Sequence, residues 1–144
     1  MENRRTEFEQ GPLDAMDAHV AALNARDDEA LFRTMHTPHV RISTAGIAIY
    51  PTQDDLRKSY LQEFSERAGA DWDHTVFESK DVIHSSETKA HVFLQFTRYD
   101  ASGNNIGTFR SLWFMTRLDW RWESQSRSCF APLFLTLIRF EICS

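Results

Sequence analysis

Four histidines occupy positions where an imidazole could perform acid–base chemistry: His19, His36, His39 and His74. Because the unperturbed pKa of imidazole is about 6.5, a histidine can take up and release a proton at cellular pH. His19 stands beside Met16, itself a candidate ligand contact, on the apolar stripe of a predicted helix. We therefore expect His19 to point inward as the main acid–base candidate, the alternative being a core histidine bonded to a backbone carbonyl.

The sequence gives weaker indications of a functional role for the other three histidines. His74 shares a strand face with Trp72 and Val76, so it either faces a cavity as a second catalytic candidate or lies at the sheet edge. His36 and His39 have the spacing of a metal pair, but the proline between them prevents a shared helical face. We expect no metal site, and we expect this pair to satisfy backbone groups at a helix-to-strand corner.

Several large side chains are expected to surround a bound molecule. Tyr60 and Trp113 could meet a ligand oxygen together with His19, and Phe64 belongs to the same inward-facing set. Arg127 could anchor a carboxylate or phosphate if it faces the interior, whereas strand arginines are more often solvated or paired with acids. The four tryptophans and eleven phenylalanines favour an apolar ligand.

Helical periodicity fills the first half of the chain. A first helix is predicted from Pro12, and a short second helix follows the acidic run 27–29 and stops before Pro38. A third helix begins with a capping box of Thr52 and Asp55 and ends at a glycine, residue 69. The inward stripes of these helices must cover a sheet.

The second half of the chain reads as strands separated by tight turns. Residues 90–96 alternate between two faces, and the turn at 102–105 leads into a strand over 106–118. The last strand is predicted over 121–130, with Trp122 on one face and Arg127 on the other. Together with a short strand pair at 40–43 and 47–50, these elements predict an α+β fold in which three helices cover the concave face of a curved antiparallel sheet. Such an arrangement leaves an apolar hole.

Both faces of the predicted sheet are apolar, and a second copy of the chain could cover the face that the helices leave open. We therefore expect a homodimer formed through the sheet. The expected organisation is a flexible N-terminus (1–12), one domain (13–132) and an apolar C-terminal tail from Leu133 to Ser144. The tail is either an edge element packed on the domain or a partner-docking segment.

Composition excludes some functional classes. The formal charge of −5 argues against a nucleic-acid-binding or anionic-membrane-binding surface. Cys129 and Cys143 fit no metal or redox spacing, so we expect free thiols and a cytoplasmic location. No sequence feature calls for a cofactor.

Residues 19–27, the Leu31-Phe32 pair, residues 96–99 and residues 122–132 resemble the nuclear-transport-factor-2-like superfamily, in the branch of ketosteroid isomerases and SnoaL-like cyclases. The resemblance covers about residues 13–132. It implies a cone-shaped, strongly curved antiparallel sheet with three helices over its concave face, the cystatin-like or ketosteroid-isomerase-like fold. This fold hosts isomerases, dehydratases, cyclases, epoxide hydrolases and non-catalytic binding modules.

The resemblance also allows a residue-by-residue comparison with the isomerases, which use a tyrosine, a protonated aspartic acid and an ionised aspartate. His19 falls at the place of the tyrosine, Ser43 at the place of the proton-shuttling carboxylate, and Trp113 near the protonated acid. A serine without a base cannot abstract a carbon-bound proton, so steroid-type isomerisation is disfavoured. Epoxide hydrolysis is disfavoured because no inward-facing carboxylate pair is found.

Two functional hypotheses remain. In the first, the protein is a cofactor-free dehydratase, cyclase or isomerase that acts on an apolar cyclic or carbonyl compound, with His19 as acid–base group and Ser43, Tyr60 or Trp113 as orienting groups. In the second, it is a non-catalytic dimeric ligand-binding or accessory module. A carboxylate or second histidine within hydrogen-bond reach of His19 would favour the first.

Overall fold

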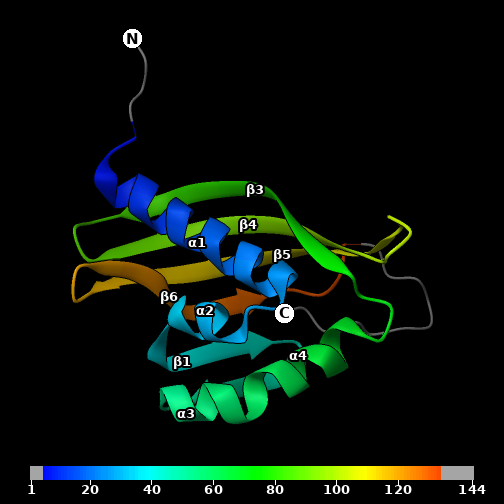
Figure 1. Ribbon diagram of the computed structural model, residues 1–144. Coiled ribbons are helices and arrows are strands. Elements are labelled where there is room, and N and C mark those ends of the chain that lie inside the picture. The colour runs from blue at the N-terminus through cyan, green and yellow to red at the C-terminus, as the bar shows by residue number, and fades with distance from the viewer. Residues whose placement is uncertain (1–4, 134–144) are drawn as a thin grey trace.

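The computed structural model describes residues 5–133 and contains one six-stranded sheet with helices packed on one face (Figure 1). In chain order the elements are α1 (Glu7–Ala25), α2 (Asp28–Arg33), β1 (Met35–Ser43), β2 (Gly46–Tyr50), α3 (Gln53–Asp55), the π-helical turn η1 (Leu56–Tyr60), α4 (Leu61–Ala68), β3 (His74–Ser85), β4 (Lys89–Tyr99), β5 (Asn105–Leu118) and β6 (Arg121–Cys129).

The strand order is β2-β1-β6-β5-β4-β3, and the sheet is not closed. Figure 1 shows α1 lying across β3, β4 and β5, while α3, η1 and α4 flank the β1 end of the sheet. The predicted α+β class with helices on one face is confirmed. The sheet is mixed rather than purely antiparallel, because β1 runs parallel to β6.

Two apolar clusters fill the space between helices and sheet. The first joins Leu13 and Met16 of α1 to the inward residues of β4 and β5, including Trp113. The predicted alternation in β4 is confirmed, since Ala90, Val92, Leu94 and Phe96 are at most 1% exposed. The second cluster lies between α2, β1, β2 and the η1–α4 helix; it contains Ala22, Leu23, Leu31, Phe32, Met35, Tyr50, Leu56, Tyr60 and Phe64.

The first two helices differ from their predicted bounds. α1 begins at Glu7, so Pro12 lies inside the helix, and residues 7–12 form its first turns. α2 ends at Arg33, and Met35 already pairs with Ser124 of β6 as the first residue of β1. Pro38 therefore lies within β1, at an irregularity in the β1–β6 register, where a residue without a backbone N–H is tolerated.

The third helical segment follows its prediction closely. Thr52 and Asp55 form the predicted capping box, in which each side chain accepts a hydrogen bond from the backbone N–H of the other residue. The segment ends at Gly69, whose φ of +85° is accessible to glycine at little cost. Its π-helical turn precedes α4, and Leu56, Tyr60 and Phe64 all point into the second cluster.

The prediction that Trp122 and Arg127 lie on opposite faces of β6 is wrong. Trp122 and Arg127 both lie on the helix side, since Trp122 packs on the first cluster and Arg127 pairs with Trp113. The cause is a register shift, because Ser124 pairs with Met115 and Ser126 with Phe114, which leaves Gln125 as an extra residue. Such a bulge changes which face the following side chains occupy.

The expectation of free thiols is wrong for Cys129, which is disulfide-bonded and only 6% exposed. Free thiols therefore no longer support the predicted cytoplasmic location. The predicted apolar tail lies outside the described residues except for Leu133, whose N–H donates to the Thr108 carbonyl oxygen. Within residues 5–133, no helix combines the length and the apolar character needed to cross a bilayer.

Candidate functional site

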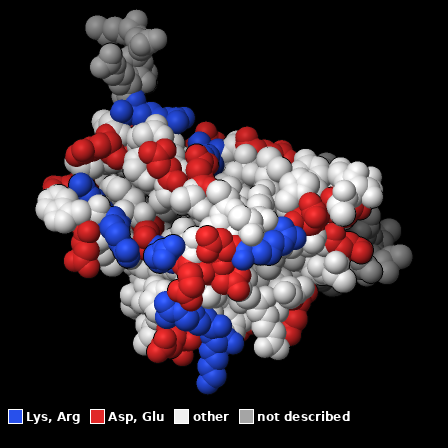
Figure 2. All heavy atoms as spheres, in the orientation of Figure 1, with Lys and Arg blue, Asp and Glu red and all other residues white. Residues whose placement is uncertain are grey.

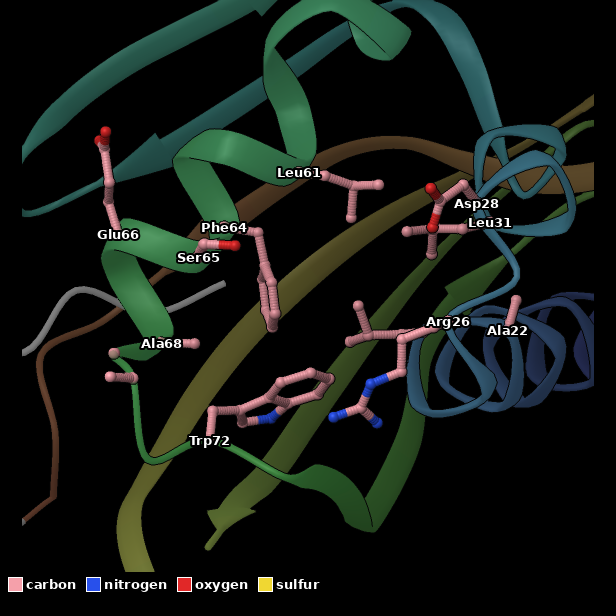
Figure 3. A pocket seen from close by; sticks show the side chains of 13 residues that line it. Ala22, Arg26, Asp28, Leu31, Leu61, Phe64, Ser65, Glu66, Ala68 and Trp72 are labelled. Atoms are coloured by element: carbon pink, nitrogen blue, oxygen red, sulfur yellow. The ribbon is translucent and has the colours of Figure 1, made fainter.

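A pocket of about 620 Å³ lies between the C-terminal half of α1, α2, α4 and the segment that leads into β3 (Figure 3). Phe64 and Trp72 project into it, with ring centroids 4.9 Å apart in an edge-to-face arrangement. Leu31 and Leu61 form the opposite wall and point toward each other. The walls are thus mostly apolar and aromatic, as in small-molecule sites.

Three charged residues are among those that line this pocket. The guanidinium of Arg26 lies 4.5 Å from the centroid of the Trp72 ring, and Figure 3 shows the two side chains alongside each other. Asp28 also borders the pocket, whereas Glu66 points away from it. Figure 2 shows acidic and basic side chains intermingled on the face that carries α1 and α2, without a basic patch.

His19 lies beyond this pocket, between α1 and the sheet, and is 3% exposed. Its Nδ1 lies 2.7 Å from Thr34 Oγ1, and that hydroxyl donates its own proton to the Leu31 carbonyl oxygen at 2.6 Å. Thr34 must therefore accept from His19 Nδ1–H, which leaves Nε2 unprotonated in the neutral ring. The imidazole meets Trp113 edge-on, with centroids 5.0 Å apart.

The surroundings of His19 oppose its protonation. Burial is the main cause of a pKa well below 6.5, and the positive charge of Arg127 lowers the pKa further. No carboxylate among residues 5–133 forms a hydrogen bond or ion pair with this imidazole. His19 is thus a neutral group at physiological pH.

A group of buried polar side chains lies next to His19, where β1 and β6 run parallel. Arg127 Nη2 donates to the Tyr60 hydroxyl at 2.6 Å, and Arg127 Nε donates to His39 Nε2 at 3.3 Å. Arg41 pairs with Arg127 in the strand register, and Arg67 of α4 lies 5.6 Å from the centroid of the Tyr60 ring. We call Arg41, Arg67 and Arg127 the arginine cluster.

Two members of the arginine cluster lack polar partners. Nε and Nη2 of Arg41, and the same atoms of Arg67, are buried without a hydrogen bond, as is Nε1 of Trp113. None of the three arginines forms an ion pair within residues 5–133. Glu63 instead accepts a hydrogen bond from Tyr50.

The excess positive charge of the arginine cluster shifts the pKa values of Arg41 and Tyr60. Burial, followed by repulsion from Arg67 and Arg127, lowers the pKa of Arg41 to about 9. Burial alone would raise the pKa of Tyr60, but the three arginines outweigh it and lower that pKa. The Tyr60 hydroxyl is therefore a better proton donor than an ordinary buried phenol.

The structure brings most of the predicted ligand contacts together. Trp113 touches His19, and the Arg127 guanidinium lies 5.2 Å from the ring centroids of both Trp113 and Tyr60. Phe64 lines the pocket instead, and Met16 is fully buried in the first cluster.

Two predicted catalytic residues lie apart from this group. Ser43 ends β1 at the hairpin turn, where its hydroxyl accepts from the Ala45 N–H. His74, whose side chain is 38% exposed, bonds Asp73 and stacks on Tyr99 at the start of β3. Within residues 5–133, no group of three or more potential ligands could hold a metal ion.

Sequence reasoning did not identify Arg41 and Arg67 as site residues. A signal for Arg41 was present, because the comparison that placed Ser43 inward also implies that His39 and Arg41, on the same strand face, point inward. Arg67 offered no such signal, since a basic residue in the last turn of a helix is ordinarily explained by the helix dipole.

Comparison with known proteins agrees with this architecture. A protein of unknown function with a cystatin-like fold from Nostoc punctiforme has a TM-score of 0.72 at 13% identity, covering 92% of this chain and 98% of that one. A ketosteroid isomerase-like protein from Erwinia carotovora atroseptica has a TM-score of 0.67 at 21% identity, covering 92% and 100%. An NTF2-like protein with a cystatin-like fold from Novosphingobium aromaticivorans gives 0.72 at 13%, covering 93% and 90%.

At these identities the structures establish the fold alone, and a comparison with curated proteins gave no significant match. The family model described as "NTF2-like protein (DUF6841)" matches residues 14–125, which is most of the domain. The chain therefore belongs to the DUF6841 family of NTF2-like proteins.

Proposed function

We propose that this protein binds a small, largely apolar molecule in the pocket between α1, α2 and α4. The observation that carries the proposal is the pocket itself, about 620 Å³ in volume, with the Phe64 and Trp72 rings among the groups that line it. Ligand sites in proteins are typically concave and apolar, with volumes of roughly 300–1,000 Å³.

The hydrogen-bond partner of His19 favours a ligand-binding function over a catalytic function based on proton transfer. Thr34 accepts its Nδ1–H, whereas neither a carboxylate nor a second histidine forms a hydrogen bond with this ring in the described chain. A catalytic imidazole that becomes protonated is ordinarily stabilised by such an acid. The proposal therefore favours the binding module over the lyase or isomerase.

A second candidate function, acid–base catalysis by a cofactor-free lyase or isomerase, has one specific observation in its favour. The Thr34 hydrogen bond leaves His19 Nε2 unprotonated, and burial lowers the pKa of the ring, so His19 is already in the basic form. Tyr60 would act as the proton donor. Turnover of a bound ligand that disappears in His19→Gln while the ligand Kd stays the same would support this candidate.

The binding proposal can be tested with N-phenyl-1-naphthylamine, a neutral apolar dye whose fluorescence rises in apolar sites. Ala22 lines the pocket and is 8% exposed, so Ala22→Phe should fill part of the space and weaken dye binding at least tenfold. Ala21→Phe, at an exposed position of the same helix, is the matched control and should bind like the wild type. The proposal fails if the wild type does not bind the dye, or if both variants bind it equally.

A further inference from the structure

We infer that the arginine cluster is a carboxylate-binding subsite, and that the ligand of this protein is an apolar organic acid. The inference rests on the proposed function in one respect, because the apolar body of the acid would occupy the pocket. It names Arg41 and Arg67 as the groups that bind the carboxylate, with Arg127 and Tyr60 as neighbours that position it.

The unpartnered guanidinium nitrogens carry the argument. Arg41 is 4% exposed, and four nitrogens of Arg41 and Arg67 are buried without an acceptor. A buried charged donor without an acceptor is costly, and native proteins retain few of them. Two such groups side by side, with no carboxylate paired to them, indicate that the acceptor is supplied from outside the described chain.

The neighbouring side chains show why Arg127 plays a different part. Its Nε and Nη2 are already committed to His39 and Tyr60, so these bonds hold the guanidinium in place. Arg41 and Arg67 keep Nε and Nη2 free, and such N–H groups can donate in pairs to the two oxygens of a carboxylate. The free Nε1–H of Trp113 offers one further donor.

The aromatic surroundings favour a carboxylate over a phosphate. Guanidinium groups of the cluster lie over the rings of Tyr60, Phe64 and Trp113 at 5.2–5.9 Å. A singly charged, planar carboxylate loses less hydration than a phosphate dianion when it enters such an apolar space. It also matches the planar guanidinium fork.

Phe64 connects the subsite to the pocket. Its ring lines the pocket, and the Arg67 guanidinium lies 5.9 Å from the centroid of the same ring. Since α4 carries both residues, a small displacement of α4 would let an acid in the pocket reach the guanidinium groups with its carboxylate. The apolar body would then remain between Leu31 and Trp72.

The test compares sodium benzoate, phenylacetate and hexanoate with the neutral analogue benzamide and with sodium phosphate, at constant ionic strength. At saturation, at least one carboxylate should raise the Tm of the wild type by about 5 °C or more. Benzamide and phosphate should not. Arg41→Met and Arg67→Met should each reduce the carboxylate shift to a fraction of this value, whereas Arg110→Met, at an exposed strand position, should retain it.

A second readout separates a binding role from a structural one. Without ligand, Arg41→Met should have a Tm equal to or higher than that of the wild type, because the change removes a buried cation that lacks a partner. A clearly lower Tm, an unchanged carboxylate shift in Arg41→Met, or no shift with any carboxylate would overturn the inference. Equal stabilisation by benzamide or phosphate would overturn it as well.

Failure of this inference can be distinguished from failure of the proposed function. If the subsite fails but the pocket is real, the wild type still binds the neutral dye and Ala22→Phe does not. If the pocket fails, dye binding is absent, and a carboxylate shift that depends on Arg41 would still establish the anion subsite.

Discussion

At the scale of single residues, two buried histidines are held in the neutral form. His19 donates Nδ1–H to Thr34, and His39 donates Nδ1–H to the Ser124 carbonyl oxygen while its Nε2 accepts from Arg127. For both, burial followed by the charge of Arg127 lowers the pKa well below 6.5. Protonation of either buried imidazole is therefore unfavourable in the folded protein.

We predict that the free energy of unfolding decreases as the pH falls below about 6.5. In the unfolded chain both histidines take up protons near that pH, whereas in the folded protein they remain neutral, so acid favours unfolding. The expected slope is about 1.4 kcal/mol per pH unit for each histidine, and no such slope is expected above pH 7. Urea unfolding between pH 7.5 and 5.5 measures it.

The matched variants are His19→Gln and His84→Gln. The first removes one of the two imidazoles whose pKa burial lowers and should roughly halve the slope, whereas the second changes an exposed histidine and should leave it intact. A wild-type stability that is constant from pH 7.5 to 5.5 would contradict the assignment of neutral buried rings.

The residues whose inward orientation was predicted correctly are those whose side is set by a regular pattern. His19 follows from the stripe of α1, and Trp113 from the alternation of β5. Trp122 and Arg127 were wrongly predicted to lie on opposite faces, because the β6 bulge at Gln125 changes the parity and a bulge has no reliable sequence signature without glycine. The arginine cluster required the parallel β1–β6 register, which local patterns do not encode.

At the scale of elements, the segment from α3 through α4 supplies both Tyr60 and Phe64. Its beginning is fixed by the Thr52–Asp55 capping box, which the sequence predicted correctly. Its π-helical turn was not predicted, because Leu56, Tyr60 and Phe64 are each four residues apart in the sequence, which is also the spacing of one face of an α-helix. The capping box therefore fixes where the segment that carries Tyr60 and Phe64 begins.

Thr52→Ala is predicted to destabilise the protein by about 1 kcal/mol, because the N–H of Asp55 loses its acceptor. The loss should appear locally as faster amide hydrogen exchange at Tyr60 and Phe64. Thr44→Ala, in the exposed β1–β2 turn, is the control and should change stability by less than about 0.5 kcal/mol. Equal effects of the two substitutions would argue against a role of the cap.

A second element-scale contact joins α1 to β6. A Cβ added at Gly11 would lie 2.5 Å from Cδ1 of Trp122 and 2.8 Å from its Nε1, which is closer than real contacts allow. The α1 backbone thus approaches the indole more closely than any other residue would permit. This contact places the N-terminal half of α1 over the start of β6.

Gly11→Ala is predicted to lower stability by about 1–2 kcal/mol, because displacement of the indole outweighs the gain of up to about 1 kcal/mol in helix propensity. In a double-mutant cycle, Trp122→Leu should relieve the clash, so that Gly11→Ala becomes neutral or stabilising in that background. Thermal and urea unfolding of the four proteins provide the measurement. An increase in stability of the single variant would show that Trp122 moves freely.

At the scale of the whole molecule, the sheet face opposite the helices exposes apolar side chains. Ile42 is 41% exposed, and Ile47 and Ile49 are 68% and 62% exposed. Ile42 and Ile47 are direct cross-strand partners, and Ile42 points away from the helix side because its neighbour Arg41 faces the arginine cluster. Half-buried Phe93, Leu112 and Phe114 continue the apolar character along β4 and β5.

We predict that this face mediates a homodimer, as the sequence pattern suggested, because a second copy is the partner that every molecule in solution has available. Sedimentation equilibrium should give about twice the chain mass for the wild type. Ile42→Glu should shift it toward the monomer, since a charge buried in an apolar interface lacks a partner. Ile83→Glu, at an exposed position on the edge strand β3, is the matched control and should remain dimeric. A wild type that sediments as a monomer at micromolar concentration would refute the dimer while leaving the pocket and the arginine cluster unaffected, because both lie on the helix side of the sheet.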